Sequence, residues 1–102
     1  MPIQKKMYVL VRRDLSVEYR FCQGMHALAQ LQQEHPVDFE AWHNTTICVL
    51  GVRNLIELRA WQVELMKKRY NFSGFFEPDL DSQITAIACY DGGQIFEGLN
   101  LA

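Results

Sequence analysis

Acidic and basic side chains gather where two predicted strands end, a position from which they could act together on an ester or a phosphate. The apolar run at 6–12 leads directly into Arg13 and Asp14, and a later strand ends at Glu77, Pro78 and Asp79. Open α/β sheets bind ligands beyond the carboxyl ends of their parallel strands. A helix N-terminus predicted just after Asp14 would add free N–H groups that favour anions. We therefore expect cations, carboxylates and a helix dipole to meet at one edge of the sheet.

Such a meeting point could support hydrolysis. Asp14, Glu77 or Asp79 would activate a water molecule, while Arg20, His26 or a backbone N–H would stabilise the oxyanion. Simpler interpretations stay open, because acidic loop residues often only form turns. Asp14 could equally cap the next helix.

The charge distribution predicts a local basic surface on an acidic molecule. The formal net charge is -2, but residues 1–33 have a balance of +3 and the remaining residues one of -5. Such a surface could hold phosphates, although clustered cations can also be no more than a solvated face. The candidate phosphate-binding residues are Lys5, Lys6, Arg12 and Arg13.

Metal and cofactor motifs are missing from the sequence. The three cysteines, Cys22, Cys48 and Cys89, are widely spaced and have apolar neighbours, so we predict reduced thiols in the core. A structural zinc site would need CxxC pairs, and the nearest approach is Cys22 with His26. The six glycines fit no phosphate-binding loop, so we expect no metal and no cofactor.

The elements that must position these residues follow from apolar periodicity and from helix caps. Strands are expected at 6–12, at 45–52, near 71–77 and at 84–90. Ser16 should cap a helix that ends near residue 34, and Asn54, with Glu57 three residues later, should cap one that ends near residue 69. The segment 35–44 is expected to be a loop.

Each helix should place an apolar stripe on the sheet. The first stripe comprises Val17, Phe21, Met25, Leu28 and Leu31, beside a polar stripe that contains Gln23 and His26. The second stripe comprises Leu55, Leu58, Trp61, Leu65 and Met66.

The element order β-α-β-α-β-β predicts an α/β protein with one compact domain over residues 1–102. Two strand-helix-strand units imply parallel neighbours, and the short connection at 79–83 suits an antiparallel return of the last strand. A four-stranded mixed sheet covered by helices follows. No apolar run is long enough to span a bilayer and no signal peptide is apparent, so we expect a cytoplasmic protein with no membrane partner.

The segment YVLVRRDLSVEYRFCQGMHALAQ resembles the opening of the type II peptidyl-tRNA hydrolases of archaea and eukaryotes. That family has an apolar strand, then R-x-D-L, then Q-x-x-H-A, matched here by Arg12, Asp14, Leu15, Gln23, His26 and Ala27. The strand QITAIA is similar to the family's V-T-A-L-A, with Thr85, Ala86 and Ala88 as the matches. Short phage-encoded relatives share the E-P-D segment, and the element order agrees from Lys6 to Tyr90.

The resemblance implies a peptidyl-tRNA hydrolase II-like fold and metal-independent cleavage of the ester between a peptide and the 3′ ribose of tRNA. The partner would be tRNA, and the protein would act in the cytoplasm. If the protein is virus-encoded, it would act in the cytoplasm of the host cell. Two features depart from the family. The G-K-G-K stretch is absent, and Arg20 is the nearest cation. The loop D-A-G-x-T is shortened to EPDLDSQ, with Glu77 or Asp79 as the nearest acid and Ser82 as the nearest hydroxyl.

Two other hypotheses remain from the sequence. The same fold could be a catalytically inactive module that binds tRNA or a protein, as the missing lysine and the shortened loop suggest. The chain could also form a homodimer through apolar side chains too numerous for so small a core to hide. The side chains that suggest this dimer are Phe39, Trp42, Phe75 and Phe76.

Overall fold

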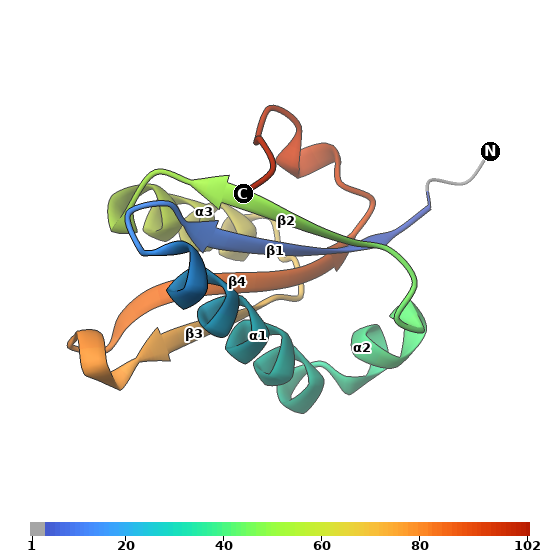
Figure 1. Ribbon diagram of the computed structural model, residues 1–102. Coiled ribbons are helices and arrows are strands. Elements are labelled where there is room, and N and C mark those ends of the chain that lie inside the picture. Colours follow the sequence, from blue (N-terminus) through green and yellow to red (C-terminus); the bar gives the residue numbers. More distant parts are fainter. Residues whose placement is uncertain (1–3) are drawn as a thin grey trace.

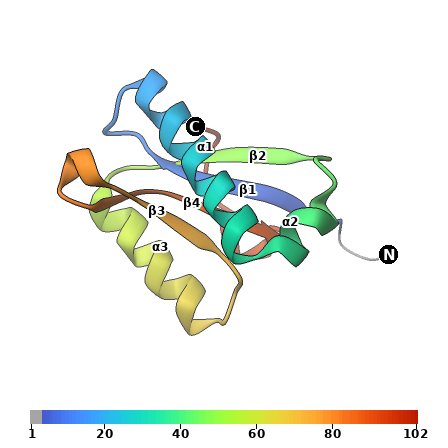
Figure 2. The same ribbon diagram turned by 90° about the horizontal axis from the view of Figure 1, so that it is seen from below.

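A four-stranded mixed sheet forms the middle layer of the computed structural model, which describes residues 4–102 (Figure 1). Helices α1 and α2 pack on one face of the sheet, and α3 packs on the other (Figure 2). In chain order the elements are β1 (Lys6–Arg12), α1 (Val17–Glu34), α2 (Pro36–Trp42), β2 (Ile47–Val52), α3 (Leu55–Lys67), β3 (Ser73–Glu77) and β4 (Gln83–Asp91), with short 3₁₀ turns at Pro78–Leu80 and Gln94–Phe96.

The sheet confirms the α/β class and corrects one part of the expected topology. Its strand order is β2-β1-β4-β3, with β1 parallel to β2, and with β4 antiparallel to both β1 and β3. The central position of β1 and the antiparallel return of β4 are as predicted. The second strand-helix-strand unit does not join neighbours, because α3 carries the chain from the β2 edge to the opposite edge at β3.

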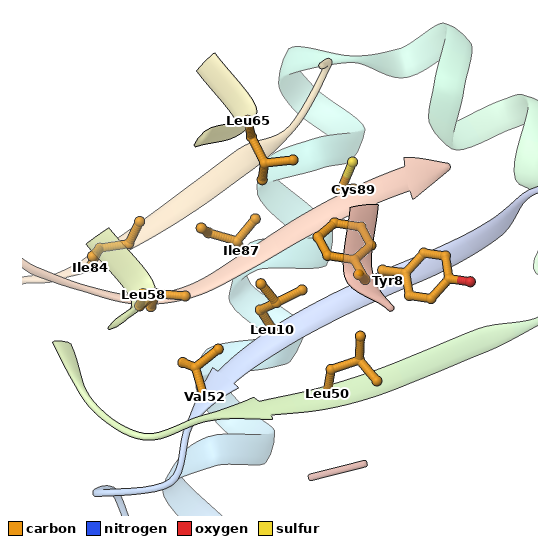
Figure 3. Close-up of a cluster of buried hydrophobic side chains, with 10 residues drawn as sticks. Tyr8, Leu10, Leu50, Val52, Leu58, Leu65, Ile84, Ile87 and Cys89 are labelled. Atoms are coloured by element: carbon orange, nitrogen blue, oxygen red, sulfur yellow. The ribbon is translucent and has the colours of Figure 1, made fainter. Parts of the chain in front are cut away.

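Each face of the sheet has its own core. The α3 face buries large aliphatic side chains such as Leu10, Leu58, Leu65 and Ile87 (Figure 3), in one cluster that also contains Phe96. The α1 face is built from smaller residues of β4 and α1, together with Met7 and Trp42. Both cores meet through β1, whose residues alternate between the two faces.

The predicted helix caps are present. The Ser16 side chain accepts a hydrogen bond from the backbone N–H of Tyr19, and Asn54 accepts one from the N–H of Glu57. Each cap satisfies one of the free N–H groups of a first turn. The segment 35–44 is not a simple loop, because Pro36 begins α2 instead of only ending α1.

The C-terminal part of the predicted apolar stripe of α1, Leu28 and Leu31, packs on the sheet, but the N-terminal part does not. The buried residues of α1 are Gln23, Gly24, Ala27 and Leu31. A Cβ atom on Gly24 would lie 3.3 Å from Val9 Cγ1, so the glycine lets the helix approach the sheet closely. Val17, Phe21 and Met25 consequently remain exposed.

Two further predictions about the core are wrong. Met66 of α3 is exposed, and so is Cys22, so neither is a core residue. Phe39 and Trp42, proposed above as part of a dimer surface, pack against each other on the α1 face, and Phe75 packs in the same core. Phe76 alone of those four aromatic residues is strongly exposed.

The C-terminal segment extends the sheet at its β2 edge. Gly51 N–H donates to Asn100 O over 2.9 Å, and Ala102 N–H donates to Val49 O over the same distance. Arg13 Nη2 donates to Leu101 O over 2.8 Å and holds the segment from the side. The segment therefore covers part of an edge strand that would otherwise be open.

Candidate functional site

The carboxylate of Glu77 lies at the centre of a hydrogen-bonded group contributed by three separate elements. Gln23 Nε2 donates to Glu77 Oε1 over 2.9 Å, which joins the middle of α1 to the end of β3. The hydroxyl of Thr85 on β4 donates to Gln23 Oε1. Gln23 and Thr85 are buried almost completely, so these bonds satisfy polar groups that water does not reach.

A β-bulge explains why Thr85 faces α1. Phe75 pairs with Ala86, but the next residue, Phe76, pairs with Ile84, so Thr85 is the additional residue on β4. A bulge re-aims the side chain at its position and is often found beside functional sites. Here it brings the Thr85 hydroxyl to the amide of Gln23.

Glu77 is stabilised in its ionised form. Its pKa is lowered, first by the hydrogen bond from Gln23 and then by the backbone N–H of Asp79, with the Tyr19 hydroxyl and the His26 imidazole also contributing. The Asp79 N–H lies 3.3 Å from Glu77 Oε2. The carboxylate is partly exposed, so it is charged at neutral pH and can still be reached by a substrate or by water.

His26 lies on the exposed side of α1, near enough to contribute to the lowered pKa of Glu77. Its ring stacks on that of Phe75 with a centroid distance of 4.3 Å and an angle of 9° between the ring planes. The stack fixes the imidazole, and its exposure leaves the ring nitrogens accessible. An imidazole next to a carboxylate is a common arrangement for proton transfer.

Arg12 and Asp14 form a separate polar group at the same edge of the sheet. Arg12 Nη2 lies 2.6 Å from Asp14 Oδ2, and Arg12 Nε lies 3.0 Å from Asp14 Oδ1. Arg12 Nη1 also donates to Gln83 Oε1 over 2.9 Å, and Gln83 pairs with Glu77 across β3 and β4. The two-point contact with Arg12 is the main cause of the lowered pKa of Asp14.

Neither arginine expected at the centre of the site contacts Glu77. Arg12 is 5% exposed and its donors are engaged within the protein, so it braces β1 against β4. Arg20 donates to Leu15 O over 2.8 Å and to Arg13 O over 2.7 Å. It therefore holds the connection between β1 and α1, and the groove that it lines does not include Glu77.

The four predicted phosphate-binding residues do not form one surface. Lys5 and Lys6 lie at the start of β1, where the Lys5 ammonium is 5.7 Å from the centroid of the Tyr90 ring. Arg12 and Arg13 lie at its other end, about 20 Å away at 3.3 Å per residue. Only Arg13 among the four is both exposed and close to the edge that carries Glu77.

The sequence-based site omitted Tyr19, Gln83 and Thr85. Thr85 appeared only as a match to the final strand of the resembling family. Tyr19 lies four residues before Gln23, a helical spacing that places the two side chains close together. The spacing could have indicated Tyr19, but Gln83 and Thr85 became site residues only through long-range strand pairing.

Two negative findings apply to residues 4–102. In that range no three His, Cys, Asp or Glu side chains are grouped in a way that could hold a metal ion. No helix there is long and apolar enough to cross a membrane.

Comparison with known proteins supports the fold alone. No protein-family model matches the chain, and no curated protein matches it in sequence. The chain is similar to a solved structure from Agrobacterium tumefaciens strain C58, described as protein of unknown function Atu0240. The TM-score is 0.73 with 13% sequence identity, and the match covers 96% of this chain and 97% of that one.

Proposed function

We propose that the chain is a cytoplasmic peptidyl-tRNA hydrolase-like protein that cleaves the ester between a peptide and the 3′ ribose of tRNA without a metal ion. One observation carries this proposal. Of the family's Q-x-x-H pair that the resemblance identifies, Gln23 donates a hydrogen bond to the carboxylate of Glu77, and His26 is near enough to help lower the pKa of that carboxylate. The peptidyl-tRNA hydrolase II-like fold belongs to the same proposal, and the observed mixed sheet is compatible with it.

In this mechanism Glu77 positions the water molecule and His26 carries the proton. The lowered pKa of Glu77 makes it a weak base but a good hydrogen-bond acceptor, so it orients the water. The water oxygen attacks the ester carbonyl carbon while His26 takes up the proton. The C–O bond to the ribose then breaks, and His26 returns the proton to the ribose oxygen.

The network behind Glu77 keeps it in place for this chemistry. Thr85 fixes the amide of Gln23 so that its NH₂ group faces the carboxylate. Tyr19 of α1 also contributes to the lowered pKa of this carboxylate, and its hydroxyl would polarise the ester carbonyl. Arg13, exposed at the same edge of the sheet, is the candidate contact for a tRNA phosphate.

The decisive experiment measures release of labelled peptide from a peptidyl-tRNA. We expect Glu77→Gln and His26→Ala each to slow release by about 100-fold or more, which is typical for the loss of a general acid-base partner. Asp81→Asn is the matched control, because Asp81 is exposed beyond the Pro78–Leu80 turn. Release by the unaltered protein that does not exceed release by Glu77→Gln would refute the hydrolase proposal.

A second candidate is a non-catalytic tRNA-binding module, which does not need a cation beside Glu77. The guanidinium groups of Arg12 and Arg20 are both bound to groups of the protein itself instead of facing Glu77. The same preparation distinguishes the candidates. Binding to tRNA that weakens with salt, combined with no peptide release, would indicate the binding module.

A further inference from the structure

The exposed side chains of α1 form an apolar stripe where a surface helix would normally be polar. Val17 is 52% exposed, Phe21 61% and Met25 64%. They lie on the side of the helix that faces β2, away from the side that carries Gln23 and His26. Any role of this stripe is therefore separate from the proposed chemistry at Glu77.

The stripe borders a groove of about 470 Å³ whose floor is the uncovered part of the sheet. Val9 of β1, together with Ile47 and Val49 of β2, lines the floor, and Phe21 and Met25 form one wall. The groove exists because α1 packs mainly on β4 and β3 and leaves β2 without a helix above it. Ile47 is 45% exposed there, so both the wall and the floor present apolar surface to water.

The apolar area exposed by this stripe and by Ile47 is close to the apolar share that one partner contributes to a stable dimer interface. At roughly 150 to 200 Å² for a large apolar side chain, the exposed parts of Val17, Phe21, Met25 and Ile47 amount to about 350 to 450 Å². A standard interface takes about 800 Å² from each partner, of which roughly 60% is apolar. These four side chains thus supply most of the apolar share.

The charges around the groove suit a symmetric pairing of two copies. Arg20 lines the groove toward the start of α1. Leu28, toward the other end, also lines a neighbouring depression that includes Glu40. A two-fold axis through the middle of the groove brings the Arg20 end of one copy toward the Glu40 end of the other.

We propose that two copies of this chain dock through this groove, with Phe21 and Met25 of each copy inserted over the β1 and β2 floor of the other. The ridge and the groove lie side by side, which is the self-complementary arrangement that an isologous interface requires. Docking would remove from water the largest apolar side chains that α1 leaves exposed. The opposite side of α1, which carries Gln23 and His26, and the neighbouring Glu77 of β3 would stay accessible to solvent in both copies.

The test is the mass in solution, measured by light scattering or by sedimentation over a range of protein concentrations. We expect a dimer of twice the 11.9 kDa chain mass. The double variant Phe21→Glu, Met25→Glu should shift the protein to a monomer, with the dissociation constant of the dimer raised by at least 100-fold. Ile56→Glu is the matched control, because Ile56 is 78% exposed on α3 and should leave the dimer intact.

A second measurement reports directly on the geometry. In a Cys22→Ser background, Met25→Cys should form a disulfide between copies under mild oxidation, whereas Ile56→Cys should not. Glu40→Lys should weaken the dimer while circular dichroism shows an unchanged fold. A protein that is still monomeric at several hundred micromolar would overturn the proposal, and would indicate that the groove binds a different protein. A dimer that the double variant leaves unchanged would also overturn it.

Discussion

Gln23 on α1 donates its amide N–H to the carboxylate of Glu77 on β3, 54 positions later in the chain, with α2, β2 and α3 between them. This one bond connects the helix that carries His26 to the sheet edge that carries the acid. It also explains why a polar residue is buried where the sequence pattern predicts an apolar stripe.

Removing the Gln23 amide should destabilise the protein. Gln23→Ala leaves the Glu77 carboxylate and the Thr85 hydroxyl without their partner and opens a cavity, so we expect a loss of about 2 to 4 kcal/mol in the free energy of unfolding. Urea denaturation measures it. Gln33→Ala, at an exposed position of the same helix, should change the value by less than about 0.5 kcal/mol. Equal losses of unfolding free energy for Gln23→Ala and Gln33→Ala would show that the hydrogen bonds of Gln23 do not stabilise the fold.

The lowered pKa of Glu77 should make stability depend on pH in the acid range. Because the pKa in the folded state lies below the ordinary value of 4.5, the ionised carboxylate stabilises the fold above about pH 4.5. That contribution is lost as the pH falls through the lowered pKa. Unfolding measured from pH 7 to pH 3 should therefore show a shallower acid decline for Glu77→Gln than for the unaltered protein. Glu18→Gln, an exposed carboxylate of α1, serves as the control.

Gly51 should be necessary for the attachment of the C-terminal segment. A Cβ atom there would lie 2.2 Å from Arg13 Nε, so Gly51→Ala must displace Arg13 from Leu101 O. We expect the fold to remain while the Ala102 amide loses at least tenfold in protection from hydrogen exchange. Arg13→Ala should produce the same loss. Adding Gly51→Ala to Arg13→Ala should then cause little further loss of protection at the Ala102 amide. Additive losses of protection would show that the two residues act separately.

The cysteines should differ strongly in reactivity. Burial, with smaller effects from Asp91 and Asp38, raises the pKa of Cys89 to about 12, so its thiol stays protonated and inaccessible. Cys22 is exposed and should be alkylated first. Mass spectrometry after brief iodoacetamide treatment should find the label on Cys22, and on Cys89 only once denaturant is present. Early labelling of Cys89 would disprove this expectation.

Local sequence signals were sufficient for the strands and the helix starts. Ser16 and Asn54 cap their helices as predicted, because a cap depends on a residue and the N–H three positions later. The predicted end of the first helix near residue 34 is also confirmed. The same local signals do not predict α2, which Pro36 starts, since proline suits the first turn of a helix as well as the position after one.

The orientation of α1 could not be predicted in this way. Periodicity shows that Val17, Phe21 and Met25 share one side of the helix, but it does not show which side meets the sheet. That choice depends on Gly24, which permits close packing, and on Thr85 and Glu77, which satisfy Gln23. Thr85 and Glu77 are both distant from α1 in the sequence, and Thr85 reaches α1 only because of the bulge in β4.

The backbone bonds of Asn100 and Ala102 to β2, which form an isolated β-bridge, have a practical consequence for handling the protein. An uncovered β edge can template the growth of fibrils, and this segment occupies part of that edge. Trimming a few residues from the carboxyl end would bare the edge and shorten the storage life of a concentrated sample.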